Sequence, residues 1–319
     1  MSSNKVVLIT GASSGIGLVT ARYLAQQGYR VFGTSRHPTQ AEANGFTLLP
    51  LDVRSAESIQ ACLQTIIAQT GRLDVLINNA GFIGPGAASE ELSVTQVKAL
   101  FETNFFGVIQ MINAVLPLMR QQGGGQIINL SSAAGRLTTP PFFGVYAASK
   151  HALEGYTEGL RYEVQPFNIR VSLVEPGYFK TSIAQTIETP DRALEVYQAR
   201  REQAATLDRL SIQAGRDPID VAQTIAQIMR GRLPRLRYVV GLDAQVMITA
   251  KRLLPFAFVE KYITWLFLHD AERRPVTSLS GLRHLFLNSR VADAAWRQAW
   301  LALALGAGVT LIFKLWRKK

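Results

Sequence analysis

A short apolar segment followed by a glycine-rich turn constrains this chain more than any other feature. Lys5 to Thr10 is an apolar run that is typical of a buried strand. The turn Gly11-Ala-Ser-Ser-Gly-Ile-Gly17 follows, and a helical pattern runs from there to Gly28. A glycine turn between a strand and a helix N-terminus predicts a phosphate cradle, because backbone N–H groups become accessible there. The alternative is an ordinary glycine-rich turn.

A second motif ends in Tyr146 and Lys150, whose spacing places both side chains on one face of a helix. A free tyrosine has a pKa of about 10. We expect the nearby ammonium to favour the phenolate and so to lower that pKa. With a hydroxyl from the Ser131-Ser132 pair, the motif favours proton transfer between an alcohol and a ketone. Chance placement of Tyr and Lys on a surface helix is the alternative.

Strand and helix patterns alternate along most of the chain, which predicts a Rossmann-type, doubly wound parallel sheet of about seven strands. Ligands of such sheets gather at the carboxyl ends of the strands. The expected strands are 5–10, 30–35, 46–51, 73–77, 126–130, 169–174 and 238–241, and the main helical patterns are 18–27, 55–69, 94–122, 146–165, 182–216 and 217–230.

The motif Thr-Gly-x-x-x-Gly-Ile-Gly together with Tyr-x-x-x-Lys resembles the short-chain dehydrogenase/reductase family, over residues 5–245. Asn78-Asn79-Ala80-Gly81 and Asn104-x-x-Gly107 match further family patterns. The Glu-Pro-Gly motif at 175–177 is most similar to that of the 17β-hydroxysteroid and retinol dehydrogenase-like branch. The resemblance implies a mobile substrate lid at about 178–216.

The resemblance also implies four catalytic roles. Tyr146 exchanges the proton, and Lys150 lowers the tyrosine pKa and holds the nicotinamide ribose. Ser132 steadies the substrate oxygen, with Ser131 as the alternative, and Asn104 orders a relay water. The segment between Ser132 and Tyr146 is one residue longer than is usual in the family, and Pro140-Pro141 can absorb the extra residue.

The end of the second expected strand favours NADP(H) over NAD(H). Ser35 stands where NAD enzymes carry an acid, and the guanidinium of Arg36 suits a 2′-phosphate; a solvated arginine is the alternative. By resemblance Asp52 meets the adenine amino group, although a helix N-cap is also consistent with its position. The expected cofactor-binding residues are Gly11, Ser13, Ser14, Gly15, Ile16, Gly17, Ser35, Arg36, Asp52, Val53, Asn79, Ala80, Gly81, Tyr146, Lys150, Pro176, Gly177 and Thr181.

Residues 246–319 depart from the family pattern and predict a helical, apolar extension that associates with a membrane. Residues 251–268 mix basic and large apolar side chains, as interfacial helices do. Residues 298–313 carry no charge and are followed by Arg317-Lys318-Lys319, which fits a spanning helix with a cytoplasmic C-terminus or a re-entrant helix. The alternative is a buried helix packed against a partner subunit.

Composition restricts the remaining possibilities. The formal net charge is +11, which favours an anionic partner such as a phosphate cofactor or a membrane surface. Nucleic-acid binding is not expected, because no recognition motif accompanies the charge. The single cysteine, Cys62, and four scattered histidines predict neither disulfides nor a metal site. The first strand begins near residue 5, so we expect a cytoplasmic catalytic domain rather than a secreted protein.

These observations predict an NADP(H)-dependent oxidoreductase that interconverts a carbonyl and an alcohol on a lipophilic substrate of steroid, retinoid or long-chain acyl type. The family resemblance further implies a homodimer or homotetramer. Two other functions stay open. One is a non-catalytic NADP-binding sensor or scaffold at a membrane. The other is a nucleotide-sugar epimerase or dehydratase, although the Gly-x-x-Gly-x-x-Gly spacing of those enzymes is absent.

Overall fold

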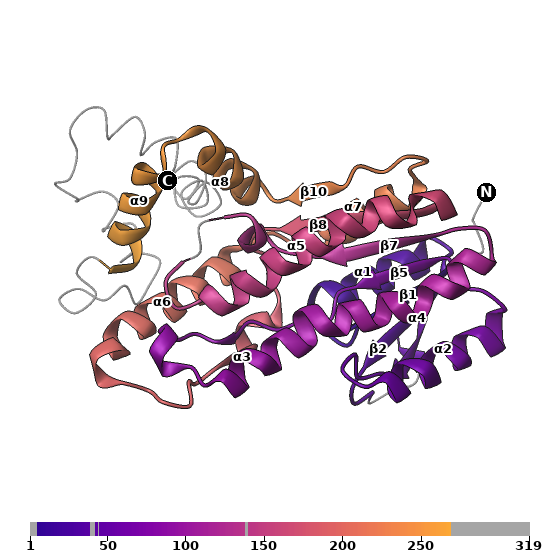
Figure 1. The fold of residues 1–319 in the computed structure, drawn as a ribbon, viewed down its shortest axis with the longest axis horizontal. Helices are drawn as coiled ribbons and strands as arrows, with labels where there is room; N and C mark the ends of the chain where they lie inside the picture. The colour runs from indigo at the N-terminus through magenta and orange to yellow at the C-terminus, as the bar shows by residue number, and fades with distance from the viewer. Residues whose placement is uncertain (1–4, 39–41, 44, 138–139, 269–319) are drawn as a thin grey trace.

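A twisted parallel sheet forms the centre of the computed structural model, which describes residues 5–38, 42–43, 45–137 and 140–268. Seven strands run parallel, and a short antiparallel strand adds to one edge (Figure 1). Their spatial order is β10 (Arg237–Val240), β8 (Ile169–Pro176), β7 (Gly125–Leu130), β5 (Val75–Asn78), β1 (Val6–Ile9), β2 (Arg30–Ser35), β4 (Phe46–Pro50) and β3 (Glu42–Ala43). The predicted Rossmann-type sheet is confirmed.

Helices cover both faces of this sheet, which explains why its strands are almost continuously apolar. Along β1, Leu8 packs into the cluster under α2 (Ala56–Thr70), α4 (Gly107–Gln121) and α5 (Gly144–Val164). Val7 and Ile9 point to the other face, toward α1 (Gly15–Gln26) and α7 (Ile219–Arg230). The two-residue period of a strand thus divides the core into two layers.

The long helix expected over 94–122 is interrupted. It consists of α3 (Val94–Phe101), a π-helical turn η2 (Glu102–Phe106) and α4. Such turns accommodate an extra residue and often mark functional sites; here the turn contains Asn104. Among the described residues, Val94–Gln121 is long and apolar enough to cross a membrane, but Leu100, Met111 and Ile112 on it are fully buried in the protein core.

The continuous helix expected over 182–216 is also wrong in part. A 3-10 turn η5 (Ser182–Thr186) is followed by β9 (Ile187–Glu188), which pairs with β6 (Gly84–Pro85), and only α6 (Glu195–Ala214) is α-helical. Pro190 disfavours a helical conformation at the preceding residue, which favours a break in the helix there. The pairing of β6 with β9 joins two loops that are about a hundred residues apart in sequence.

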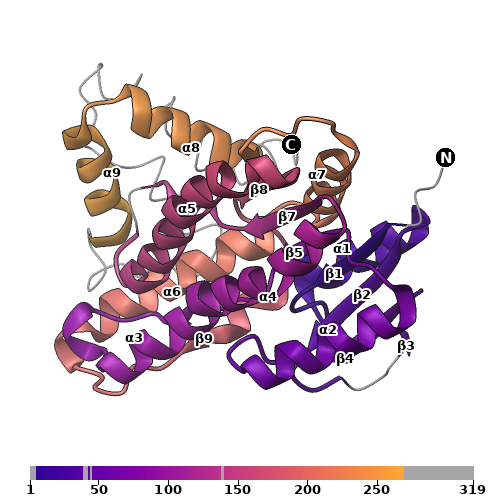
Figure 2. The ribbon, with the colours of Figure 1, turned by 45° about the vertical axis from the view of Figure 1, so that its right-hand side comes forward.

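The segment 251–268 is not one continuous helix. Pro255 separates α8 (Leu242–Leu253) from α9 (Phe256–Leu268), and Leu254 before it is extended, as the residue before proline prefers. Figure 2 shows α6, α8 and α9 at the end of the domain away from β2 and β4. The uncharged segment 298–313 lies outside the described residues. Three short 3-10 turns complete the elements, η1 (Ser89–Glu91), η3 (Ala133–Gly135) and η4 (Gln165–Phe167).

Candidate active site

A cavity of about 730 Å³ opens at the carboxyl ends of the central strands. Its walls come from the segments that follow β1, β2, β4, β5, β7 and β8, together with α5, α6 and the start of α8. This is the edge at which the sequence predicts cofactor and chemistry to meet. The cavity has two ends, one beside the glycine turn and one beside Tyr146.

The glycine turn presents its backbone to the cavity. Gly11 and Gly15 have φ of +67° and +55°, a conformation that favours glycine. Ser13, Ser14, Gly15 and Ile16 line the cavity, and α1 begins there without a side-chain N-cap, so its first N–H groups can donate to a bound anion. Gly17 does not line the cavity. A Cβ there would collide with the Gly11 carbonyl, so Gly17 serves the packing of the turn.

Ser35, Arg36, Asp52 and Val53 line the same end of the cavity, as expected. Asp52 forms a 2.6 Å ion pair with Arg54, and these hydrogen bonds hold the pKa of Asp52 below its ordinary value. The alternative of Asp52 as an N-cap is wrong, because Ser55 caps α2 by accepting from the Ser58 N–H. Arg54 also lines the cavity and was missed; its place directly after Asp52-Val53 is the signal that was available.

The segment after β5 braces the glycine turn. The Asn79 amide donates to the carbonyls of Thr10 and Gly11, at 2.9 Å each, while the Thr10 hydroxyl accepts from the Ala80 N–H. Asn79, Ala80 and Gly81 all line the cavity. Residues after two neighbouring strands are therefore held together, and the Asn79 amide N–H groups are used within the protein.

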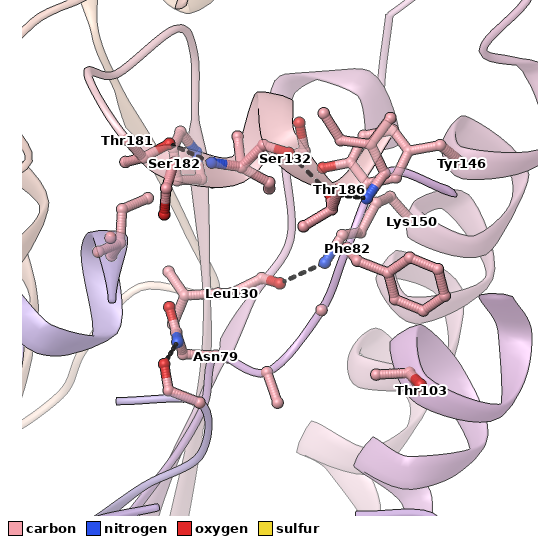
Figure 3. A pocket seen from close by; sticks show the side chains of 18 of the residues that line it. Asn79, Phe82, Thr103, Leu130, Ser132, Tyr146, Lys150, Thr181, Ser182 and Thr186 are labelled. Carbon is pink, nitrogen blue, oxygen red and sulfur yellow. Dashed lines mark hydrogen bonds between the residues drawn. The ribbon is translucent and has the colours of Figure 1, made fainter. Parts of the chain in front are cut away.

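Three of the predicted catalytic side chains converge at the other end of the cavity (Figure 3). Lys150 is buried and donates from Nζ to the Leu130 carbonyl at 2.9 Å, with Nζ 6.0 Å from the Tyr146 ring centroid. The Ser132 side chain hydrogen-bonds to Tyr146, whereas the Ser131 hydroxyl has no partner among the described residues. Ser132 is thus the serine placed next to the phenol.

The expected low tyrosine pKa is wrong for the protein by itself. Burial raises the pKa of Tyr146 to about 12, although the bond from Ser132 acts to lower it and the charge of Asp208 adds to the rise. Burial also lowers the pKa of Lys150 to about 8, so the ammonium is itself destabilised. The geometry therefore favours a protonated phenol, which is the form that donates a proton to a carbonyl.

Asn104 lies close to this group but does not line the cavity. It is fully buried, accepts from the Phe82 N–H and donates to the Phe82 carbonyl and to the Ser149 hydroxyl. Its side chain fixes the loop after β5 against α5. Asn104 lies in the π-helical turn. One lone pair of its Oδ1 remains for a further hydrogen bond.

The loop after β8 closes the cavity between its two ends. Pro176, Gly177 and Thr181 line the cavity, and a Cβ at Gly15 would lie 3.5 Å from the Cβ of Thr181. Asp243 of α8 accepts from the Tyr178 N–H at 2.8 Å and so fixes this loop. Nothing in the sequence pattern singled out Asp243, because its partner is 65 residues away.

Beyond Tyr146 the cavity wall is mainly apolar. Ile83 and Phe143 belong to a buried cluster with Leu207 and Ile212 of α6, and Ile263 of α9 packs against it. This wall combines the loop after β5, the start of α5 and α6. One acid interrupts it: Asp208, also on α6, lines the cavity and was not predicted.

The residues present fit a phosphate-bearing dinucleotide. The uncapped start of α1 and the exposed Ser13 and Ser14 offer anion-binding groups at one end. Arg36 and Arg54, which follow β2 and β4 in the chain, add positive charge to the cavity wall. One continuous cavity extends from the glycine turn to Tyr146.

Comparison with known proteins identifies the family. The family model of the short chain dehydrogenases matches residues 5–192. The chain belongs to the short-chain dehydrogenase/reductase family. It is 40% identical over 250 residues to a 3-ketodihydrosphingosine reductase of Bacteroides thetaiotaomicron, covering 76% of this chain and 90% of that protein. It is 39% identical over 254 residues to retinol dehydrogenase 8 of Bos taurus, covering 73% and 80%.

Solved structures support this short-chain dehydrogenase assignment. A short-chain dehydrogenase from Streptomyces avermitilis shares 33% identity with a TM-score of 0.68, covering 83% of this chain and 96% of that one. Two others at 25% identity were solved with a cofactor. A serine dehydrogenase carries NADP⁺ (TM-score 0.64, 74% and 94% covered), and a Burkholderia phymatum enzyme carries NAD (TM-score 0.68, 82% and 96% covered). Such enzymes are oxidoreductases acting on carbonyl and alcohol groups with NAD(P).

Proposed function

We propose that this short-chain dehydrogenase interconverts a carbonyl and an alcohol on a lipophilic substrate, with NADP(H) as its cofactor. The observation that carries the proposal is the single cavity that joins the glycine turn and Arg36 to the Tyr146, Ser132 and Lys150 group. When bound, the cofactor supplies the hydride. The protein supplies orientation and the proton.

In the reductive direction the Tyr146 hydroxyl donates its proton to the substrate oxygen, and Ser132 steadies that oxygen with a hydrogen bond. Lys150 is anchored to the Leu130 carbonyl at 2.9 Å, which leaves its other N–H groups for the nicotinamide ribose and the phenol. Asn104 is proposed to order a relay water beside Lys150. Its side chain is largely occupied by Phe82 and Ser149, so this role falls to the remaining Oδ1 lone pair.

The preference for NADP(H) rests on the end of β2. Arg36 lines the cavity and is exposed, while the position before it is Ser35 rather than an acid. A dianionic 2′-phosphate would bind a guanidinium here, and the residue at the end of β2 is not a carboxylate that would repel it. The neighbouring Arg54 is held by Asp52, which leaves Arg36 as the more available cation of the two.

The lipophilic substrate is supported by the apolar wall beyond Tyr146 and by relatives whose names refer to 3-ketodihydrosphingosine and retinol. We further propose that residues 246–319 form an extension that docks the enzyme on a membrane. Leu253 and Phe256, at the junction of α8 and α9, are 74% and 63% exposed beside Lys251 and Arg252. Apolar and basic side chains together suit an anionic lipid surface. Assembly into a homodimer or homotetramer stays an implication of the family resemblance.

The test is a turnover screen of the purified full chain. NADPH consumption is measured in detergent with 3-ketodihydrosphingosine, retinal and a short soluble ketone, and NADH is tested in parallel. We expect turnover of a lipophilic carbonyl with NADPH preferred. A protein that binds NADPH tightly but reduces none of them would support the alternative of a non-catalytic sensor or scaffold.

A further inference from the structure

One acid lies apart from the other carboxylates of the cavity. Of the described acids that line it, Asp52 is paired with Arg54, Glu188 is exposed at β9, and Asp243 holds the loop after β8. Asp208 instead projects from α6 into the apolar wall beyond Tyr146. It belongs to none of the roles assigned above to proton transfer or cofactor binding.

The carboxylate of Asp208 is only half satisfied. Tyr178 provides a side-chain hydrogen bond, but Oδ2 is buried without a partner among the described residues. A buried carboxylate oxygen without a hydrogen-bond partner is costly. Glu154, Glu175 and Asp243 each have one as well, but of these only Asp243 lines the cavity, and it already holds the loop after β8. The atom lies on a wall of the substrate-binding end of the cavity, so a ligand group is in position to satisfy it.

Asp208 also acts electrostatically on the reaction centre. Its charge contributes to the raised pKa of Tyr146, which places the carboxylate within Coulombic range of the phenol. Arg209, which is exposed on the same helix, acts to lower the pKa of Asp208 and so partly offsets the effect of burial. A positive charge on the substrate would be attracted to the Asp208 carboxylate and would offset its effect on the phenol.

We propose that Asp208 binds an ammonium group of the substrate close to the reacting carbonyl, so that the preferred substrates are lipophilic α-amino ketones. This inference rests on the proposed function, since it assumes that the carbonyl oxygen sits at the Tyr146 hydroxyl. An ammonium on the neighbouring carbon would then be in reach of Asp208 on α6. Its charge would satisfy Oδ2, and the alkyl chain would lie along Ile83, Phe143 and Ile212.

The inference is tested with three ketones of equal chain length that carry an amine, a hydroxyl or only hydrogen on the carbon beside the carbonyl. We expect the wild-type enzyme to reduce the amino ketone with the highest kcat/KM. In Asp208→Asn, which keeps shape and removes charge, the preference for the amino ketone over the hydrogen analogue should fall about ten- to a hundredfold. Glu202→Gln, on the exposed face of α6, is the matched control and should keep the wild-type preference.

Binding without turnover provides a second readout. A long-chain primary amine should bind the Tyr146→Phe protein with NADP⁺ present, and the additional Asp208→Asn change should weaken that binding by a similar factor in calorimetry. Thermal melting establishes that each variant is folded. The ammonium site is refuted if Asp208→Asn slows all three ketones equally, or if the hydroxy ketone is preferred. Failure of wild-type enzyme to reduce any ketone, with Asp208-dependent amine binding intact, would instead contradict the proposed reaction.

Discussion

The two ends of the cavity are built in different ways. The cofactor end is made of short segments, each directly following a strand: Gly11 to Ile16 after β1, Arg36 after β2, and Asn79 to Gly81 after β5. The substrate end is held by contacts between distant parts of the chain. Glu91 of η1 accepts from the Leu194 N–H, and the Ile83 N–H donates to Thr186, each across 103 residues.

This difference teaches where specificity can be changed without loss of the fold. The cofactor end is tied to the sheet, so changes there act on the scaffold as well as the ligand. The substrate end is carried largely by α6, which packs on Ile83, Phe143 and α9 rather than on a sheet strand. Four variants, in order of decreasing expected effect, test this contrast.

The largest effect is expected where the two ends meet. Tyr146→Phe removes the proton donor while keeping the ring, so kcat should fall about 10²- to 10⁴-fold. The Kd for NADPH, measured by fluorescence titration, should change little, because the phenol lies away from the glycine turn. Retention of near-wild-type turnover in this variant would remove Tyr146 from the mechanism. Tyr156→Phe, a partly buried tyrosine on the same helix that packs on Phe105, serves as the control.

The next effect concerns the anchor of α6. Glu91 is fully buried and accepts from the Ala88 and Leu194 N–H groups and from Arg201. Burial acts to raise the pKa of Glu91, but these bonds hold it below its ordinary value. Glu91→Ala leaves the Arg201 cation without its partner and should cost about 3 kcal/mol of unfolding free energy in urea.

The same ion pair has a defined pH dependence. Because the folded pKa of Glu91 is lowered, its stabilisation is present at neutral pH and is lost as pH falls through the folded value. The difference between wild type and Glu91→Ala should therefore shrink in acid. Glu90→Ala, next to it but exposed and bonded to Tyr197, should cost less than about 1 kcal/mol. Equal losses in the two variants would argue against α6 being anchored by Glu91.

The contrast also explains what the sequence could predict. The seven parallel strands and the cavity-lining positions Gly11 and Ser13 to Ile16 follow from patterns within a few residues, because a strand end fixes where the next residues lie. Asp208 could not be found in this way. The groups that interact with it, Tyr178 and Tyr146, belong to other elements that lie far from it in sequence. The π-helical turn at Asn104 was missed for a similar reason, since its polar partner Phe82 lies 22 residues away.

A smaller effect is expected at the cofactor end. Arg36→Leu removes the cation proposed to bind the 2′-phosphate and should raise the KM for NADPH about ten- to a hundredfold. The KM for NADH should stay within about threefold, as that cofactor lacks the phosphate. Arg30→Leu, at the opposite end of the same strand, is the matched control. If both KM values rise together, Arg36 supports the scaffold and does not select the cofactor.

The smallest effect is a gain in stability at the substrate end. Burial raises the pKa of Asp208 to about 6, so folding favours its protonated form, and the folded protein loses stability as pH rises from about 4 through 6. Asp208→Asn should therefore raise the free energy of unfolding at pH 8 by on the order of 1 kcal/mol, less than the full shift implies because the side chain is not completely dry.

The gain should be much smaller near pH 4, where the wild-type carboxyl is protonated in the folded state and about half protonated in the unfolded state. Urea unfolding at both pH values measures this difference, with Glu202→Gln as the control that should show no gain at either pH. An acid kept at the expense of stability is expected where a ligand needs its charge. A variant that is destabilised at pH 8 would mean that Asp208 supports α6 through Tyr178, and that the contrast between a rigid cofactor end and an adaptable substrate end does not extend to this residue.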